Sequence, residues 1–362
     1  MIVATCPRRI FIIGSDIFDS VGDSYRRSLD KYYDVAIFDP FQVIEFNKEN
    51  RSKWNEALIL FSRVALGDPF ALVGTRLQKA IRRFEPDIVL TTALESLAPH
   101  WISKIRTDFP LAKLLGVFSD HIANFERGYF FLSEYDALFF KDRYIVEKLR
   151  GKLGWKHVFY LPQACDPEIH HPIPMTKADM EVFGCDITLA GNVYSYRAAQ
   201  LAPLIGRDMR IWGNGVPRWL DHPIQQHCVP RYVAGKDKCR AMLAAKIVIN
   251  SNHYAEINGT NKRTFEVASI GAFQLTDTPA LADVFIPDVE IATFTTQSDM
   301  VGKIDYYLQR PELRAKMAKS ACDRAHREHT YAHRWTAKMA AIGYAVPLDF
   351  PVQREKVTHH AE

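Results

Sequence analysis

The stretch that decides the fold is residues 246–273, KIVINSNHYAEINGTNKRTFEVASIGAF. Residues 246–250 form an apolar run typical of a buried strand, and a polar loop with one glycine follows. Asn261 has the residue type and position of a helix N-cap, and Gly271 separates the expected helix from the next strand. The loop and the helix N-terminus therefore follow the carboxyl end of a strand, where open α/β sheets bind their ligands.

Two cations, Lys262 and Arg263, open this expected helix. Positive side chains oppose the dipole at a helix N-terminus, so the arrangement makes sense if an anion such as a diphosphate lies between them and the backbone N–H groups. Glu266 shares a helix face with Arg263, where its carboxylate is placed to accept hydrogen bonds from ribose hydroxyls. The alternative is a surface ion pair between Arg263 and Glu266, which contributes only about 0.2–0.5 kcal/mol.

Short apolar runs alternate with helical patterns along the whole chain, which predicts βαβ units, parallel strands and an α/β fold. Eleven expected strands are too many for one typical doubly wound sheet, so two sheets are the simpler interpretation. A proline-rich stretch, residues 162–184, indicates a linker between them. We therefore expect domains over residues 1–165 and 166–330, a last helix over 331–345 and a polar tail over 346–362. The predicted strands are residues 10–13, 35–38, 88–90, 114–118, 137–140, 158–161, 187–190, 210–212, 246–250, 273–276 and 290–293.

Residues 261–272 resemble the Asn-x-Arg-x-Phe-Glu-x-x-Ala/Ser-x-Gly signature of group 1 glycosyltransferases, and are closest to their spore-maturation-protein-like branch. Residues 186–192 with Arg197, and residues 329–331 with Arg334, resemble two further elements of that family. The resemblance implies a GT-B fold of two facing Rossmann-like domains, with the last helix crossing back to the N-terminal domain. It also implies transfer of a sugar, as by a hexosyltransferase, from a nucleotide-diphosphate sugar to an acceptor hydroxyl.

The implied donor site lies in the second domain. Gly191 and Asn192 end its first strand, where a tight turn lets backbone N–H groups approach a phosphate, and the alternative is an ordinary turn before a helix. The candidate residues for the donor diphosphate and ribose are Gly191, Asn192, Arg197, Lys262, Arg263 and Glu266.

Related retaining enzymes carry two glutamates eight positions apart, and the second aligns with Glu266. The first falls on Asn258, which can hydrogen-bond the donor sugar but has no charge. Glu256, two residues earlier, is the alternative for this role. The resemblance favours retention of configuration.

In the N-terminal domain, Asp120 and His121 follow an expected strand. Asp120 is a candidate to orient or deprotonate the acceptor hydroxyl, and His121 to contact the donor sugar or reaction centre. The alternative is helix capping by Asp120 beside an exposed histidine. Gly14 and Ser15 end the first strand and form a candidate acceptor-side loop.

The composition of the chain limits which binding partners and cofactors are expected. The net charge is only +4, from 46 basic and 42 acidic residues, so bulk charge does not argue for nucleic acid. The six cysteines form no Cys-x-x-Cys pair, which favours reduced thiols and a cytoplasmic protein.

No apolar run approaches the ~20 residues of a membrane span. The chain has no Asp-x-Asp triplet, the element by which the other large glycosyltransferase fold chelates its metal, so we expect metal-independent transfer with no cofactor beyond the nucleotide sugar.

The acceptor is less constrained. Residues 47–85 have a helical pattern that ends in a basic face. We weigh peripheral docking on an anionic membrane with a lipid-linked acceptor against an amphipathic helix packed on the sheet. A glycan, lipid-linked or protein acceptor in cell-surface polysaccharide or glycoconjugate synthesis fits the family. Two other functions stay open: a sugar-nucleotide 2-epimerase of the same fold, and a non-catalytic nucleotide-sugar-binding protein, which Asn258 supports best.

Overall fold

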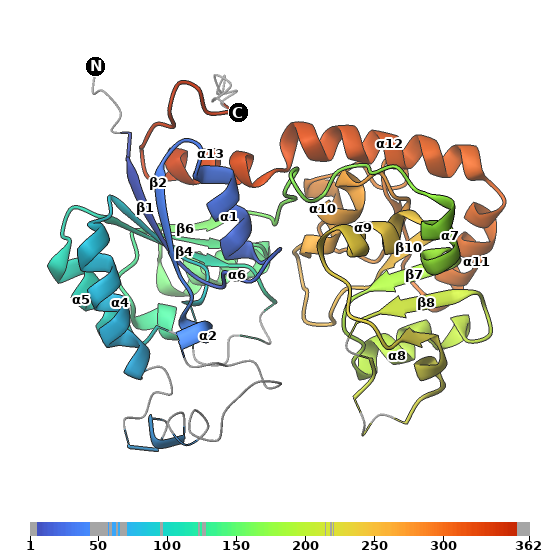
Figure 1. Cartoon of the computed structure of the whole chain (residues 1–362), viewed down its shortest axis with the longest axis horizontal. Helices are drawn as coiled ribbons and strands as arrows, with labels where there is room; N and C mark the ends of the chain where they lie inside the picture. The colour runs from blue at the N-terminus through green and yellow to red at the C-terminus, as the bar shows by residue number, and fades with distance from the viewer. Residues whose placement is uncertain are drawn as a thin grey trace. The chain divides into compact units, whose positions relative to one another are not determined.

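The structure is a computed structural model that describes residues 6–43, 57, 60–62, 64–65, 71–94, 97–121, 124, 128–213, 215–217, 219 and 221–352. The chain divides into two compact units (Figure 1). Unit 1 comprises Met1–Phe140, Ile145–Leu161 and Tyr331–Glu362, and unit 2 comprises Lys141–Tyr144 and Pro162–Thr330.

Unit 1 is built on a parallel sheet whose described strands follow the order β2-β1-β3-β4-β5-β6. The order reverses between β1 and β3, which pair directly with Ile10 opposite Ile88. The strands are β1 (Arg9–Ile13), β2 (Asp34–Phe38), β3 (Ile88–Thr91), β4 (Lys113–Phe118), β5 (Ala137–Phe140) and β6 (Val158–Tyr160).

Helices cover both faces of this sheet. One face packs on α4, α5 and α6, whose apolar stripes include Leu77, Ile102 and Val146. The other face is covered by α1 and the last helix, α13. The helices of unit 1 are α1 (Val21–Leu29), α2 (Pro40–Val43), α4 (Ala71–Phe84), α5 (Pro99–Asp108), α6 (Arg143–Leu153) and α13 (Tyr331–Ala341), with a 3₁₀ turn at Tyr129–Leu132. The first two residues of α6 belong to unit 2.

Helix α13 belongs to unit 1 although it follows unit 2 in the chain, which confirms the predicted return of the last helix. Its Tyr331 ring meets Tyr25 edge-on at 4.8 Å, and Trp335 Nε1 donates to the Tyr33 hydroxyl at 3.0 Å. The following segment, predicted as a polar tail, contains Phe350, which is 2% exposed and packs on the Tyr33 ring. Residues 353–362 lie outside the described residues.

Unit 2 carries a second parallel sheet, and its described strands follow the order β12-β11-β10-β7-β8-β9. Here the order reverses between β7 and β10, which pair with Ile187 opposite Ile247. This is the strand order of a dinucleotide-binding Rossmann sheet. The strands are β7 (Cys185–Ala190), β8 (Met209–Trp212), β9 (Cys228–Val229), β10 (Ala245–Asn250), β11 (Gln274–Thr276) and β12 (Ala292–Thr293).

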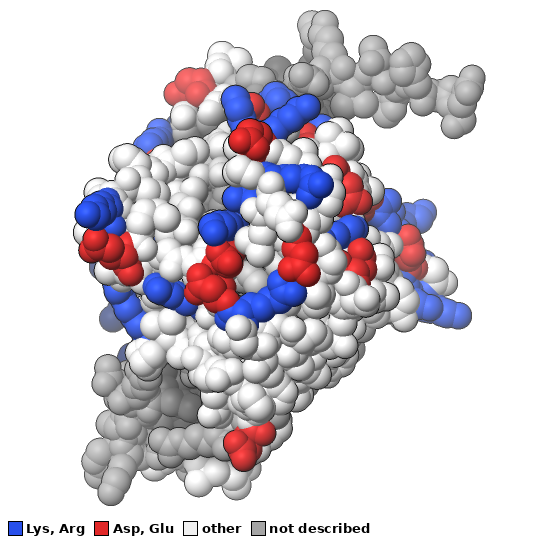
Figure 2. All heavy atoms as spheres, turned by 90° about the vertical axis from the view of Figure 1, so that its right-hand side faces the viewer, with Lys and Arg blue, Asp and Glu red and all other residues white. Residues whose placement is uncertain are grey.

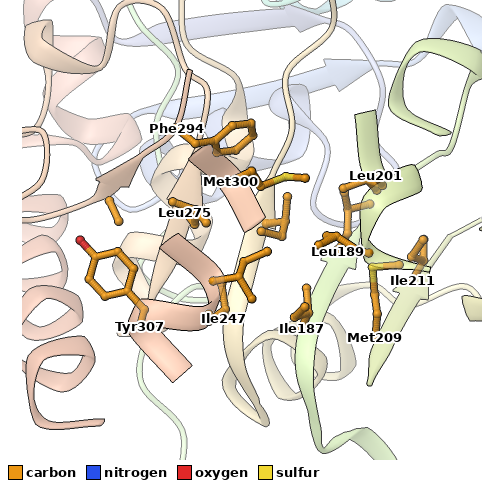
Figure 3. Packing of buried hydrophobic residues seen from close by; sticks show 14 of the residues in the cluster. Ile187, Leu189, Leu201, Met209, Ile211, Ile247, Leu275, Phe294, Met300 and Tyr307 are labelled. Atoms are coloured by element: carbon orange, nitrogen blue, oxygen red, sulfur yellow. The ribbon is translucent and has the colours of Figure 1, made fainter. Parts of the chain in front are cut away.

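The main core of unit 2 lies between this sheet and the helices α8 and α11 (Figure 3). Ile187, Leu189 and Ile247 from the strands meet Leu201 and Met300 from the helices. The opposite face packs on α9 and α10. The helices are α7 (Lys177–Phe183), α8 (Ser195–Leu201), α9 (Gly235–Leu243), α10 (Lys262–Ser269), α11 (Gln297–Leu308) and α12 (Pro311–Glu328), with 3₁₀ turns at Ala202–Leu204, Pro223–His227 and Leu281–Asp283.

Each of the eleven predicted strands has a counterpart, and β9 is an addition of two residues. The stretch 162–184, interpreted as a linker, belongs to unit 2 and contains α7. Thr176 and Asp179 form a capping box at the start of α7, a helix-start signal that the neighbouring prolines obscure in the sequence.

The membrane-docking hypothesis concerned residues 47–85, of which most of 47–70 lie outside the described residues. Among the helices that are described, none is both long and apolar enough to span a bilayer. On the face shown in Figure 2, basic and acidic side chains are intermixed.

Candidate functional site

The candidate donor site lies at the carboxyl ends of β7 and β10, where the strand order of unit 2 reverses. Gly191 directly follows β7, and Asn250 is the last residue of β10. In doubly wound sheets this position opens a crevice for ligands, because the loops from the two neighbouring strands diverge. Residues from both loops and from the start of α10 meet here.

A network of amide and hydroxyl side chains positions the start of α10. Asn261 is the N-cap, as predicted, and its Oδ1 accepts from the Thr264 N–H at 3.0 Å. Its Nδ2 donates to Asn250 Oδ1 at 2.8 Å and to Asn252 Oδ1 at 2.6 Å. Asn250 Nδ2 donates in turn to Gln274 Oε1 at 3.0 Å on the neighbouring strand. Because these groups are largely buried and mutually bonded, the helix N-terminus is fixed against the sheet.

Arg197, on α8, ties the two strand-end loops together. Its side chain is buried, and its Nη2 donates to the backbone carbonyl of Ser251 at 2.6 Å. Its Nη1 donates to the carbonyl of Asn192, and the guanidinium lies 4.6 Å from the centre of the Tyr194 ring. Arg197 therefore holds the β7 loop against the β10 loop while keeping its positive charge.

Arg263, on the first turn of α10, reaches the same place from the other side. Its Nη1 donates to Asn250 Oδ1 at 3.4 Å. A Cβ at residue 191 would lie 2.0 Å from Arg263 Nη2 and 3.8 Å from Arg197 Nη1, so both guanidinium groups lie beside Gly191. Gly191 also has φ +146°, a backbone conformation that favours glycine.

Glu266 and Asp277 act on Arg263 and Arg197, respectively, only through their charge and without direct contact. Among the residues that the structure describes, no carboxylate forms an ion pair with Arg197 or Arg263. Burial, followed by the charge of Arg197, lowers the pKa of Arg263 to about 10, and burial lowers the pKa of Arg197. Both side chains are charged at neutral pH. Buried charge without a partner is costly, so the arrangement suits an anion with several oxygens.

Glu266 forms a different ion pair from the one considered in the sequence analysis. Its Oε1 lies 3.3 Å from Lys262 Nζ and 3.0 Å from Lys238 Nζ, and His170 Nε2 is 3.6 Å away. Arg263 is directed toward Gly191 instead, so Lys262 takes the pairing position one turn before Glu266. No local sequence pattern indicates Lys238 or His170, because tertiary packing alone brings them here.

The loop after β10 holds the two candidates for the family's first glutamate. Glu256 forms a buried ion pair with Lys141, at 2.5 Å between Oε2 and Nζ, with side chains 2% and 5% exposed. The Asn258 N–H donates to the Asp142 carboxylate at 3.2 Å, and the Asn258 carbonyl accepts from the Arg143 N–H at 3.0 Å. The carboxylate of Glu256 is thus paired with Lys141. The backbone of Asn258 is hydrogen-bonded on both sides, and the residue is partly exposed.

In unit 1, Gly14 and Ser15 lie at the reversal of strand order between β1 and β3. A Cβ at Gly14 would be 1.9 Å from Thr92 Oγ1, so glycine lets the β1 and β3 loops approach closely. At the end of β4, Asp120 accepts from the His121 N–H at 2.8 Å and from Asn124 Nδ2 at 2.5 Å. His121 Nε2 is 3.7 Å from Asp120 Oδ1. Asp120 thus orders its own turn and holds His121 beside it.

Comparisons with known proteins show which proteins this chain resembles. Residues 186–340 match the family described as glycosyl transferase-like. Spore protein CgeB of Bacillus subtilis (strain 168) is 22% identical over 262 residues, which are 66% of this chain and 77% of that protein. These findings confirm the resemblance to group 1 glycosyltransferases and their spore-maturation-protein-like branch.

Solved structures confirm the fold. Sucrose-phosphate synthase from Thermosynechococcus elongatus superposes with a TM-score of 0.64 at 12% identity, covering 92% of this chain and 98% of that chain. Anabaena Alr3699/HepE, solved in complex with UDP and glucose, superposes with a TM-score of 0.61 at 10% identity, covering 92% and 99%. The two units of this chain therefore have the GT-B glycosyltransferase fold.

Proposed function

We propose that this chain is a glycosyltransferase that moves a sugar from a nucleotide-diphosphate sugar to an acceptor hydroxyl. The observation that carries the proposal is that two guanidinium groups, Arg197 and Arg263, lie beside Gly191, and that neither forms an ion pair with a carboxylate among the described residues. A diphosphate supplies the missing negative charge and accepts several hydrogen bonds at once. The N-terminus of α10 and the reversal of strand order add two further features of phosphate sites.

This geometry addresses the hardest part of the reaction, the departure of the nucleoside diphosphate. Negative charge on the leaving group grows as the bond to the sugar breaks, and fixed cations at that position lower the barrier more than they stabilise the bound donor. Because the side chains already supply two positive charges, we propose that transfer needs no metal. Glu266 is the proposed ribose ligand, with Lys262 beside it, and Asn192 completes the phosphate loop.

The remaining roles follow the resemblance. Asn258 is the proposed contact to the donor sugar, because Glu256 is engaged by Lys141. Asp120 and His121 are proposed to act on the acceptor hydroxyl and the reaction centre, beside an acceptor-side loop at Gly14 and Ser15. We further propose a retaining, cytoplasmic enzyme of cell-surface glycan or glycoconjugate synthesis, in keeping with the UDP and glucose bound by Anabaena Alr3699/HepE.

The test is calorimetry with UDP, GDP, dTDP and CMP, with and without a chelator, followed by transfer assays with the matching nucleotide sugar. We expect one nucleoside diphosphate to bind whether or not the chelator is present. Arg263→Gln is expected to lose that binding about 100-fold or more, since hydrogen bonds to charged groups contribute about 1.5–3 kcal/mol each. Arg310→Gln, an exposed arginine on the same unit, serves as the matched control.

Unchanged affinity in Arg263→Gln would overturn the site assignment. Epimerised nucleotide sugar in a reaction without acceptor would favour the 2-epimerase. Tight nucleotide binding with neither transfer nor hydrolysis of the sugar would favour the non-catalytic binding protein.

A further inference from the structure

Four aromatic rings continue the surface of unit 2 beyond the two arginines. Tyr194, whose face carries the Arg197 guanidinium, lies 4.8 Å from the His253 ring. His253 lies 4.2 Å from Tyr254, and Tyr254 meets Tyr196 in an edge-to-face contact at 5.8 Å. The β7 loop and the start of α8 supply two of these rings, and the β10 loop supplies the other two.

The outer rings are exposed although they belong to an ordered cluster. Tyr254 is 66% exposed and Tyr196 is 41% exposed. Large aromatic surfaces usually lie inside a protein or at a binding surface, because leaving them in water forfeits their hydrophobic free energy. We call Tyr196, His253 and Tyr254 the aromatic platform.

Hydrogen bonds to the backbone of the β10 loop hold Tyr194 and His253 in place. The Tyr194 hydroxyl donates to the Asn252 carbonyl at 3.1 Å. His253 Nδ1 accepts from the Ala255 N–H at 3.1 Å, and its carbonyl accepts from the Glu256 N–H at 2.9 Å. Since the loop is fixed before any ligand arrives, little conformational freedom is lost when a ring stacks on it.

The negative charge of Asp277, close to Tyr196, favours a neutral ligand on the aromatic platform over an anion. Asp277 accepts from Gln200 Nε2 at 2.7 Å and from the Asn252 N–H at 2.8 Å. Its negative charge also acts on Tyr196, whose pKa is raised by burial and then by Asp277. An anion is therefore favoured at the arginines and disfavoured at Tyr196, whereas a polyhydroxylated ring meets no repulsion.

We infer that the aromatic platform binds a pyranose ring of a glycan acceptor, stacked on Tyr254 with Tyr196 at its edge. The C–H groups on one face of a pyranose carry a weak positive charge and pack on the negative face of an aromatic ring. The hydroxyls of Tyr196 and Tyr254 can donate hydrogen bonds to sugar hydroxyls or accept hydrogen bonds from them. Tyr194 contacts both Arg197 and the platform residue His253, so the platform begins on the far side of Tyr194 from Arg197. This inference rests on the proposed function and names its acceptor class as carbohydrate.

The experiment uses the full chain and a printed panel of oligosaccharides ending in glucose, galactose, mannose or N-acetylglucosamine, with the tightest nucleoside diphosphate present. We expect the wild type to bind a subset, Tyr254→Ala to weaken that binding about tenfold or more, and Tyr254→Phe to keep it within about twofold, because the phenylalanine ring preserves the stacking face. Tyr306→Ala removes another exposed tyrosine, on α11, and is expected to change nothing.

Calorimetry on the same variants separates this inference from the proposed function. Unchanged affinity for nucleoside diphosphate and for nucleotide sugar in Tyr254→Ala supports an acceptor platform. If Tyr254→Ala lowers the affinity for the nucleotide sugar but not for the nucleoside diphosphate, Tyr254 contacts the donor sugar. If it lowers the affinity for the nucleoside diphosphate, Tyr254 contacts the base. Either result overturns the inference. It is also overturned if no glycan binds the wild type, or if Tyr254→Ala binds glycans equally well. Absence of nucleotide binding with intact platform-dependent glycan binding would instead defeat the proposed function.

Discussion

The Nη2 atom of Arg263 lies 2.0 Å from the point where any residue other than glycine at position 191 would place its Cβ. The glycine that ends β7 thus has a second role beside the one expected from the sequence. It was expected to let backbone N–H groups approach a phosphate. It also makes room for the guanidinium that a phosphate would contact.

Gly191→Ala is therefore expected to displace Arg263 and to weaken nucleoside diphosphate binding. It should also lower the free energy of unfolding by about 1–3 kcal/mol, because alanine is strained at φ +146°. Gly206→Ala is the matched control, since Gly206 has φ +91° but a Cβ added there would have no atom within 4 Å. Both variants should lose stability in urea unfolding, whereas calorimetry should show lost binding only for Gly191→Ala. Equal binding by the two variants would contradict the role given to this glycine.

Arg197 and Arg263 should differ in their effect on folding. Arg197→Met leaves the carbonyls of Ser251 and Asn192 without this donor, so we expect a loss of about 1–3 kcal/mol in the free energy of unfolding. Arg263→Met removes one of two neighbouring positive charges and should cost less or stabilise the protein. Pyrophosphate should raise the melting temperature of the wild type and of neither variant. A larger loss of stability in Arg263→Met than in Arg197→Met would show that the charges do not repel as inferred.

The Lys141–Glu256 pair should behave as a structural unit. Lys141→Met leaves the buried carboxylate of Glu256 without this lysine, which is expected to cost about 3–5 kcal/mol. The double variant Lys141→Met/Glu256→Leu should recover most of that loss in urea unfolding, because no isolated charge remains. If Glu256 has no catalytic role, the double variant also keeps sugar transfer, and Asn258→Ala loses it with nucleotide affinity unchanged. Abolished transfer in a stable double variant would return the role to Glu256.

Lys338 on α13 is expected to make the free energy of unfolding depend on pH. Its side chain is fully buried, its Nζ donates to the Tyr25 hydroxyl, and it lies 4.3 Å from the centre of the Tyr25 ring. Burial, then the charge of Arg334, lowers the pKa of Lys338 well below its usual value. Unfolding then takes up a proton between the lowered pKa and about 10.4, so this residue makes stability rise with pH across that window.

Lys338→Met is expected to remove this slope and to raise the free energy of unfolding at neutral pH. Urea midpoints at pH 7 and pH 9.5 measure the effect, and Lys152→Met, at an exposed position on α6, is the control. A slope that is the same in Lys338→Met and in the wild type would rule out Lys338 as its source.

The sequence predicted the features that local pattern determines. Buried strands such as β10 are recognisable by unbroken apolar runs, and Asn261 by its place before a helix. The two-residue strand β9 leaves no pattern, because it is specified by pairing with β8. The same holds for the site: the signature around Arg263 located it, but contacts of His170 and Lys238 with Glu266 depend on segments far apart in the chain. Burial of Lys338 was equally unpredictable, since lysine is ordinarily a surface residue.

The return of α13 to unit 1 has a consequence for how the protein is made. Tyr331, Trp335 and Met339 are core residues of unit 1, yet they leave the ribosome after the whole of unit 2. Domains generally fold as they emerge, beginning at the N-terminus. In this chain unit 1 begins to be synthesised before unit 2 and is completed after it, so α1 lacks its α13 contacts until Tyr331–Ala341 has been synthesised. A ribosome that stalls before Tyr331 releases a chain whose second unit has all its residues and whose first unit does not.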